Sequence, residues 1–153
     1  MDPKIVRKPG FNVVGFKYRG KNEKNEIPQL WQEFSKRFGE LKHIFEEEVA
    51  YGVMDNFDHE KGDFDYVAGI AATTKEDQPA DSVYWQIPEQ TYAVFSTTLP
   101  AVRQTFDNIY GKWLPKSGYQ RRPGPEFELY DEKFNAKDPD SEFDIYIPIL
   151  KPN

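Results

Sequence analysis

Hydrophobic residues recur at helical spacing in two stretches of the chain. The first stretch contains Leu30, Phe34, Phe38, Leu41 and Phe45. Intervals of three or four residues place these side chains on one face of a helix, so we predict a helix over residues 28–45. The same spacing predicts a second helix over residues 100–114, which Pro115 is expected to end. Its apolar positions are Val102, Phe106, Ile109, Tyr110, Trp113 and Leu114.

The other hydrophobic stretches are rich in β-branched and aromatic residues and are bounded by polar or Gly- and Pro-containing segments. This pattern is typical of strands. We therefore predict strands over residues 4–7, 11–19, 48–56, 63–73, 83–88, 90–98, 126–132 and 142–150. The polar segments between them are predicted to be loops.

The two halves of the chain, residues 1–82 and 83–153, show the same order of strand, helix, strand, strand. Each half has too few elements to enclose a core, so pairing the halves about a pseudo-two-fold axis is expected. We predict a single α+β domain over residues 1–153. In it, duplicated strand-helix-strand-strand modules form a curved antiparallel sheet with two helices and a central pocket at the seam.

Side-chain alternation along the strands predicts which residues face this pocket. In the last strand an apolar row that includes Phe143 and Ile145 is expected to face the core, with Tyr146 on the opposite side. In the strand over residues 126–132, Phe127 and Leu129 form the apolar row, so Glu128 is predicted to lie on the same side as Tyr146. The corresponding residue of the first half is a glycine, and the acid has no counterpart there.

Composition excludes several classes of protein. The chain of 153 residues has no Cys and two His, which excludes disulfides and Cys-based metal sites, and no metal site is expected. It contains no glycine-rich phosphate-binding motif, and no cofactor is expected. A net charge of −6 argues against direct nucleic-acid binding. Without an apolar run of about 20 residues or a secretory signal, we expect a cytoplasmic protein that does not bind membranes.

Three motifs in the second half resemble the GyrI-like effector-binding domains, which occur at the C-terminus of AraC- and MerR-type transcription regulators and also alone. The motifs are the segments WLPKSGY (residues 113–119), PEFELY (residues 125–130) and DIYIPI (residues 144–149). The resemblance covers essentially the whole chain. It implies a duplicated strand-helix-strand-strand fold and an aromatic pocket with a buried Glu that neutralises cationic ligands, a role that falls on Glu128. No DNA-binding helix-turn-helix is present, which argues against a direct role in transcription.

Several aromatic residues are candidates to complete a cation site, because ring faces attract organic cations by about 0.5–2 kcal/mol each. The candidate ligand-binding residues are Glu128, Tyr51, Trp85, Phe106, Tyr130 and Tyr146. Helical spacing also allows Phe106 to pack in the core, together with Phe34, Phe38 and Trp113. The pair Arg121 and Arg122 is predicted to be solvated.

Three functions remain open at this stage. The leading hypothesis is a domain that binds small amphipathic molecules, cationic or aromatic, for sensing or sequestration. The alternative, implied by some stand-alone members that the chain resembles, is a hydrolase of electrophilic cyclopropane-type genotoxins. In that case Glu128 would be the catalytic acid or base. The third is an interaction module with a protein partner.

Overall fold

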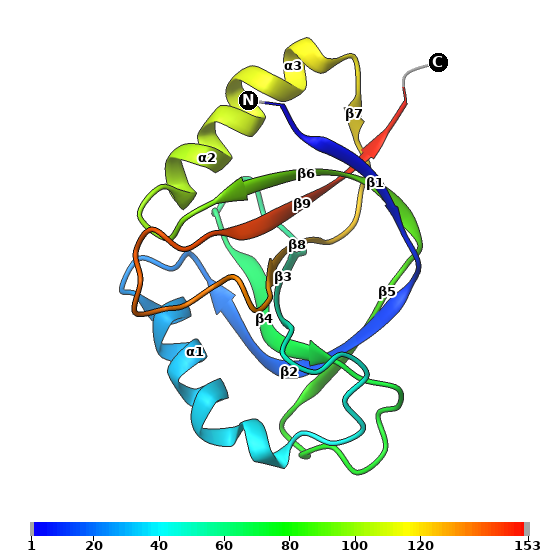
Figure 1. The fold of residues 1–153 in the computed structure, drawn as a ribbon, viewed down its shortest axis with the longest axis vertical. Helices are drawn as coiled ribbons and strands as arrows, with labels where there is room; N and C mark the ends of the chain where they lie inside the picture. The colour runs from blue at the N-terminus through cyan, green and yellow to red at the C-terminus, as the bar shows by residue number, and fades with distance from the viewer. Residues whose placement is uncertain (1, 152–153) are drawn as a thin grey trace.

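The computed structural model describes residues 2–151, and its framework is an antiparallel sheet (Figure 1). The strands are β1 (Lys4–Lys8), β2 (Phe11–Gly20), β3 (Ala50–Asp55), β4 (Phe64–Ala71), β5 (Val83–Ile87), β6 (Gln90–Thr97), β7 (Gln120–Arg121), β8 (Glu126–Tyr130) and β9 (Phe143–Leu150). They follow the order β1-β6-β9-β8-β3-β4-β2-β5, with β7 paired to β9. The end strands β1 and β5 do not pair with each other, so the sheet is not closed.

The strand order is symmetric about the contact between β3 and β8. One half of the sheet reads β3-β4-β2-β5 outward from this contact, and the other reads β8-β9-β6-β1. The outermost strands are exchanged, because β1 pairs with β6 and β5 pairs with β2. The predicted α+β fold of two duplicated modules is therefore confirmed, and the exchange ties the two halves together.

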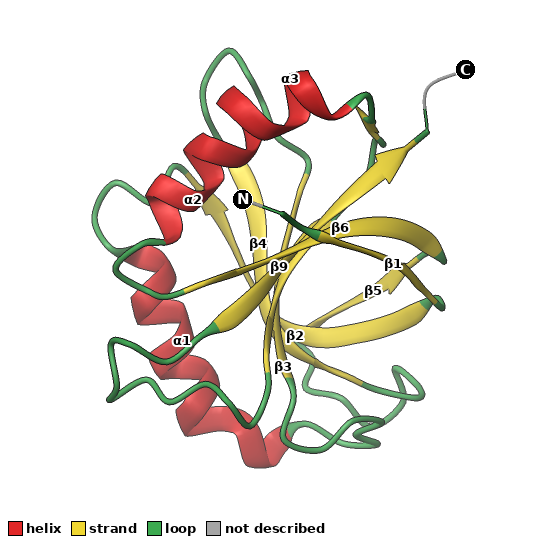
Figure 2. Cartoon of the chain, turned by 45° about the horizontal axis from the view of Figure 1, so that its top comes forward, coloured by secondary structure: helices red, strands yellow, loops and turns green. Residues whose placement is uncertain are grey.

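Both helical segments lie on the same side of the sheet (Figure 2). Helix α1 (Glu26–Arg37) is followed by a 3-10 turn, η1 (Phe38–Glu40), and then by extended backbone at Leu41. The prediction that this helix reaches residue 45 is wrong: Phe45 lies beyond the turn and is 66% exposed. No helix within residues 2–151 combines the length and the apolar character needed to cross a membrane.

The second helical segment differs from its prediction at both ends. Helix α2 (Val102–Asn108) continues into a π-helical turn, η2 (Ile109–Trp113), and then into α3 (Leu114–Ser117). Pro115 does not end the segment. It lies in the first turn of α3, directly after the π-helical turn.

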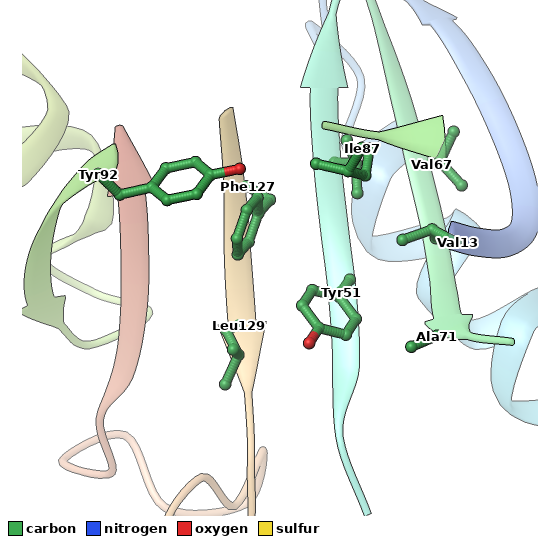
Figure 3. Packing of buried hydrophobic residues seen from close by; sticks show 9 residues of the cluster. Val13, Tyr51, Val67, Ala71, Ile87, Tyr92, Phe127 and Leu129 are labelled. Atoms are coloured by element: carbon green, nitrogen blue, oxygen red, sulfur yellow. The ribbon is translucent and has the colours of Figure 1, made fainter. Parts of the chain in front are cut away.

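Both faces of the sheet are packed. The face away from the helices encloses a cluster that we call the inner core, where side chains from both halves meet (Figure 3). Its buried members are Val13, Tyr51, Val53, Val67, Ala71, Ile87, Tyr92, Phe127 and Leu129. Two further clusters lie beneath the helices, one around Phe34 of α1 and one around Ile109 of the π-helical turn.

The register of β8 and β9 corrects the predicted orientation of Glu128. Phe127 pairs with Tyr146, and their rings stack with centroids 4.6 Å apart. Glu128 pairs with Ile145 and so lies on the helix side of the sheet, opposite to Tyr146. The prediction failed because it assigned one core-facing side to both strands. Since both faces are packed, the apolar row of β8 faces the inner core while that of β9 packs under α2.

We predict that Gly15→Ala lowers the free energy of unfolding by roughly 1–3 kcal/mol, the usual cost of overpacking a core. Gly15 pairs with Gly69, and an added Cβ would lie 2.1 Å from the carbonyl oxygen of Ala68. Urea denaturation measures the change. Gly39→Ala is the control, because no atom of the described part of the chain, apart from its immediate neighbours and its own helical backbone, lies within 4 Å of its added Cβ. Equal unfolding midpoints for the two variants would contradict the close contact between β2 and β4.

Candidate functional site

A cleft of about 1790 Å³ lies between α1 and α2, over the seam where β3 meets β8. Trp31 and Phe34 of α1 form one wall, and Val102, Phe106 and Tyr110 form the other. Strand residues form the floor: Met54 of β3, Tyr66 of β4, and Glu126, Glu128 and Tyr130 of β8. Each module thus contributes one helix and part of the floor, as expected for a site at the seam.

Glu128 is a buried acid on this floor that has no ionic partner among the described residues. Its side chain accepts hydrogen bonds at Oε1 from the hydroxyls of Tyr66, at 2.6 Å, and Tyr130, at 2.9 Å. Trp31 Nε1 in turn donates to the Tyr66 hydroxyl at 2.9 Å, which links the network to α1. Within residues 2–151, no side chain donates to Oε2, and no Lys, Arg or His forms an ion pair with Glu128.

Burial sets the protonation of this network. Loss of water raises the pKa of Glu128 to about 7, against the hydrogen bonds of the two tyrosines, which favour the charged form. Burial also raises the pKa of Tyr66 and of Tyr130 well above the ordinary value for tyrosine. Both hydroxyls therefore stay protonated and act as donors, while the carboxyl group is divided between its two forms near neutral pH.

A glycine makes room for the network. Gly52 of β3 lies directly opposite Glu128 in the sheet. A Cβ at this position would be 2.0 Å from the hydroxyl oxygen of Tyr66 and 2.7 Å from Oε1 of Glu128. Since such distances are far below van der Waals contact, any larger side chain would separate the hydroxyl from the carboxylate.

A second acid on the same floor has a cation of its own. Glu126 is 4% exposed, and its Oε1 accepts hydrogen bonds from the Tyr110 hydroxyl and from Arg121 Nη2, the latter at 3.0 Å. Burial raises the pKa of Glu126, and the bonds from Tyr110 and Arg121 oppose that rise. The prediction that Arg121 is solvated is wrong: its side chain is 22% exposed and is also bonded to the carbonyl oxygen of Gly124 at 3.0 Å.

The structure brings three of the six predicted ligand-binding residues together. Glu128, Tyr130 and Phe106 all line the cleft. The ring of Tyr130 packs against Trp31 and Phe134, with centroids 5.4 and 4.8 Å apart. These rings provide an aromatic wall beside the carboxylate.

The other three predicted residues lie on the opposite face of the sheet. Tyr51 is fully buried in the inner core, and its hydroxyl donates to Glu46 at 2.6 Å. Trp85 and Tyr146 pack against the same core. Strand alternation could not place them, because their orientation relative to Glu128 depends on the pairing between distant strands.

Sequence reasoning missed four residues of the site: Trp31, Tyr66, Glu126 and Arg121. Alternation carried a partial signal for Glu126, since it shares a face with Glu128 on the same strand. Trp31 stands beside the apolar stripe of its helix, whereas nothing near Tyr66 or Arg121 in sequence points to a carboxylate partner. Among the described residues, no group of three or more His, Asp or Glu is placed to hold a metal ion.

Comparison with known proteins assigns the chain to a family. The family Cass2, integron-associated effector binding protein, matches residues 4–149. The chain is 38% identical over 152 residues to the transcriptional regulator BrlR of Pseudomonas aeruginosa. That match covers 97% of this chain and 56% of BrlR, so the chain spans about half the length of this curated relative.

Solved structures share the fold at lower identity. SAV2435 bound to tetraphenylphosphonium has a TM-score of 0.78 and 18% identity, covering 98% of this chain and 94% of that one. The integron cassette protein VCH_CASS2 of Vibrio cholerae has a TM-score of 0.70 and 23% identity, covering 97% and 96%. The C-terminal domain of EcmrR has a TM-score of 0.70 and 15% identity, covering 99% and 98%. Together with the matched family, they confirm the GyrI-like resemblance, and the chain belongs to the Cass2 family of integron-associated effector binding proteins.

Proposed function

We propose that the chain binds small amphipathic organic cations in the cleft between α1 and α2, with Glu128 as the group that recognises their charge. The observation that carries this proposal is a buried carboxylate whose hydrogen-bond donors, within residues 2–151, are all neutral hydroxyls. A buried charge without an opposite charge is costly. A cationic ligand supplies that opposite charge and gains more from it in this enclosed site than it would in water.

The surroundings of Glu128 fit a ligand with an apolar or aromatic body. The cleft is lined by rings from both helices and by Tyr130 and Phe134. Apolar contact contributes roughly 25 cal/mol per Å² of buried ligand surface, and ring faces add attraction for a cation. The related fold of SAV2435 was solved with tetraphenylphosphonium, an ion of this chemical class.

The network around Glu128 prepares the site before a ligand arrives. Tyr66 and Tyr130 hold Oε1 from two directions, and Trp31 holds the Tyr66 hydroxyl. The carboxylate of Glu128 is already desolvated and oriented. Ligand binding therefore does not have to displace water from Glu128 or order its side chain. Oε2 carries no hydrogen bond from these groups and is the oxygen that we assign to the cation.

A hydrolase remains the second candidate, and the pKa of about 7 for Glu128 favours it, since a general acid or base acts best near the working pH. In that reaction, Glu128 would take a proton from water as the water oxygen forms a bond to one carbon of the strained ring. The ring C–C bond breaks with its electron pair going to the other carbon, which then receives the proton from Glu128, so that the product is the substrate plus one water. Incubation with a cyclopropane-bearing alkylating agent distinguishes the two functions by mass spectrometry. A product heavier by one water supports hydrolysis, and recovery of unaltered bound compound supports binding alone.

We expect Glu128→Gln to weaken the binding of tetraphenylphosphonium at least about tenfold, because the amide keeps the shape of the side chain but not its charge. Binding of neutral triphenylphosphine oxide should change less than about threefold. Calorimetric titration measures both affinities.

The matched control for this test is Glu132→Gln, which removes the same charge from an exposed residue outside the cleft. It should leave both affinities unchanged. Equal weakening of the cationic and neutral ligands by Glu128→Gln would contradict charge recognition by Glu128.

The affinity for tetraphenylphosphonium should fall as the pH decreases below about 7, by up to about tenfold per pH unit, and should be nearly constant above it. The sign follows from the raised pKa: below that value the free site holds a proton, which must leave before the cation binds. Titrations between about pH 5.5 and 8.5 measure this profile. Glu128→Gln should abolish the slope, and a wild-type affinity that is independent of pH would contradict the assignment.

A further inference from the structure

The floor of the cleft carries two acids on one face of β8, and only one of them is open to a ligand. Glu126 and Glu128 are two residues apart on the strand, so their side chains leave the same face about 7 Å apart. Glu128 is bonded to neutral hydroxyls, whereas Glu126 is bonded to the guanidinium of Arg121. The cleft is therefore built around two anionic positions, with a cation of the protein already at one.

Arg121 is held at this position from several directions. Its Nη2 donates to Glu126 and to the carbonyl oxygen of Gly124, both at 3.0 Å. Its Nε donates to the Tyr110 hydroxyl at 3.0 Å, and its Nη1 donates to the carbonyl oxygen of Arg122. These four acceptors fix the guanidinium of Arg121 beside Glu126. Tyr110 comes from the π-helical turn, a local geometry that is common at functional sites.

We propose that Arg121 determines charge specificity by occupying the second anionic position, so that the cleft accepts ligands with one positive charge and rejects those with two. This inference rests on the proposed function. With Arg121 in place, the net charge of the two acids and the guanidinium is −1, which one ligand cation neutralises. A second ligand cation about 7 Å from the first would meet the guanidinium and be repelled.

Three probes with one two-ring scaffold test this specificity at about pH 8, where Glu128 is ionised. They are neutral 4-phenylpyridine, the monocation 1-methyl-4-phenylpyridinium and the dication methyl viologen, whose ring nitrogens lie at opposite ends of the scaffold. The wild-type chain should bind the monocation more tightly than the dication. Arg121→Met leaves Glu126 free to pair with the second charge. It should raise the ratio of dication to monocation affinity at least about tenfold.

The double variant Arg121→Met/Glu126→Gln is the matched control, because it removes the ion pair as a unit and leaves the second position neutral, as in the wild-type chain. Its affinity ratio should return to within about threefold of the wild-type value. An unchanged ratio in Arg121→Met, with monocation binding retained, would overturn this inference alone. If the wild-type chain binds neither the monocation nor the dication, the proposed function is overturned as well.

Arg121→Met leaves a buried acid without its partner and can impair folding, so a second variant tests the same claim in the opposite direction. Glu126→Gln keeps Arg121 as a cation without a carboxylate partner. Monocation affinity should then fall at least about tenfold, while the affinity for 4-phenylpyridine stays within about threefold of wild type. Equal affinities of wild type and Glu126→Gln for the monocation would overturn the inference, provided that circular dichroism shows the variant to be folded.

Discussion

A carboxylate that is buried on a sheet and held by hydrogen bonds from two tyrosine hydroxyls is the constraint on which this site depends. Removing a charge from water is expensive, and hydrogen bonds from Tyr66 and Tyr130 recover only part of that cost. The chain keeps Glu128 buried all the same, with a pKa near neutrality. Such a group is a poor contributor to stability, since an apolar residue would pack there at less cost. Its chemistry therefore argues for a role in recognition.

The pseudo-two-fold arrangement explains why Glu128 lies at the seam and why the first module has no carboxylate at the corresponding position. The halves meet through β3 and β8, so the residues of these strands form the floor at the seam. Gly52 is the residue of the first module that corresponds to Glu128, and it also faces Glu128 across the seam, whereas Met54 faces Glu126. A carboxylate at both central positions would bring two like charges together in a dry site. The glycine avoids this and leaves space for the Tyr66 hydroxyl.

The fold was largely predictable from local patterns, because both helices and the strands that form the main path of the sheet have clear periodicity. The face of the sheet that each strand side chain occupies could not be predicted from local patterns. Glu128 and Tyr130 were placed in the site through alternation and the GyrI-like resemblance. Tyr51 and Tyr146 were expected there too, but Tyr51 lies in the inner core and Tyr146 packs against it. Which face a strand residue occupies depends on its register with partners far away in the sequence. No pattern within one strand of a sheet packed on both faces reveals that register.

Whether Glu126 and Glu128 are paired with a cation depends even more strongly on residues that are distant in the sequence. Glu126 and Glu128 are alternate residues of one strand, and burial raises the pKa of each. They differ because Arg121 of β7 donates a hydrogen bond to Glu126 and is held there by the Tyr110 hydroxyl and by the carbonyl oxygens of Arg122 and Gly124. In sequence this residue is half of a basic pair in a Pro- and Gly-rich segment, with nothing to mark it as buried. The charge that the cleft presents to a ligand is therefore set as much by a partner that neutralises one acid as by the acid that stays free.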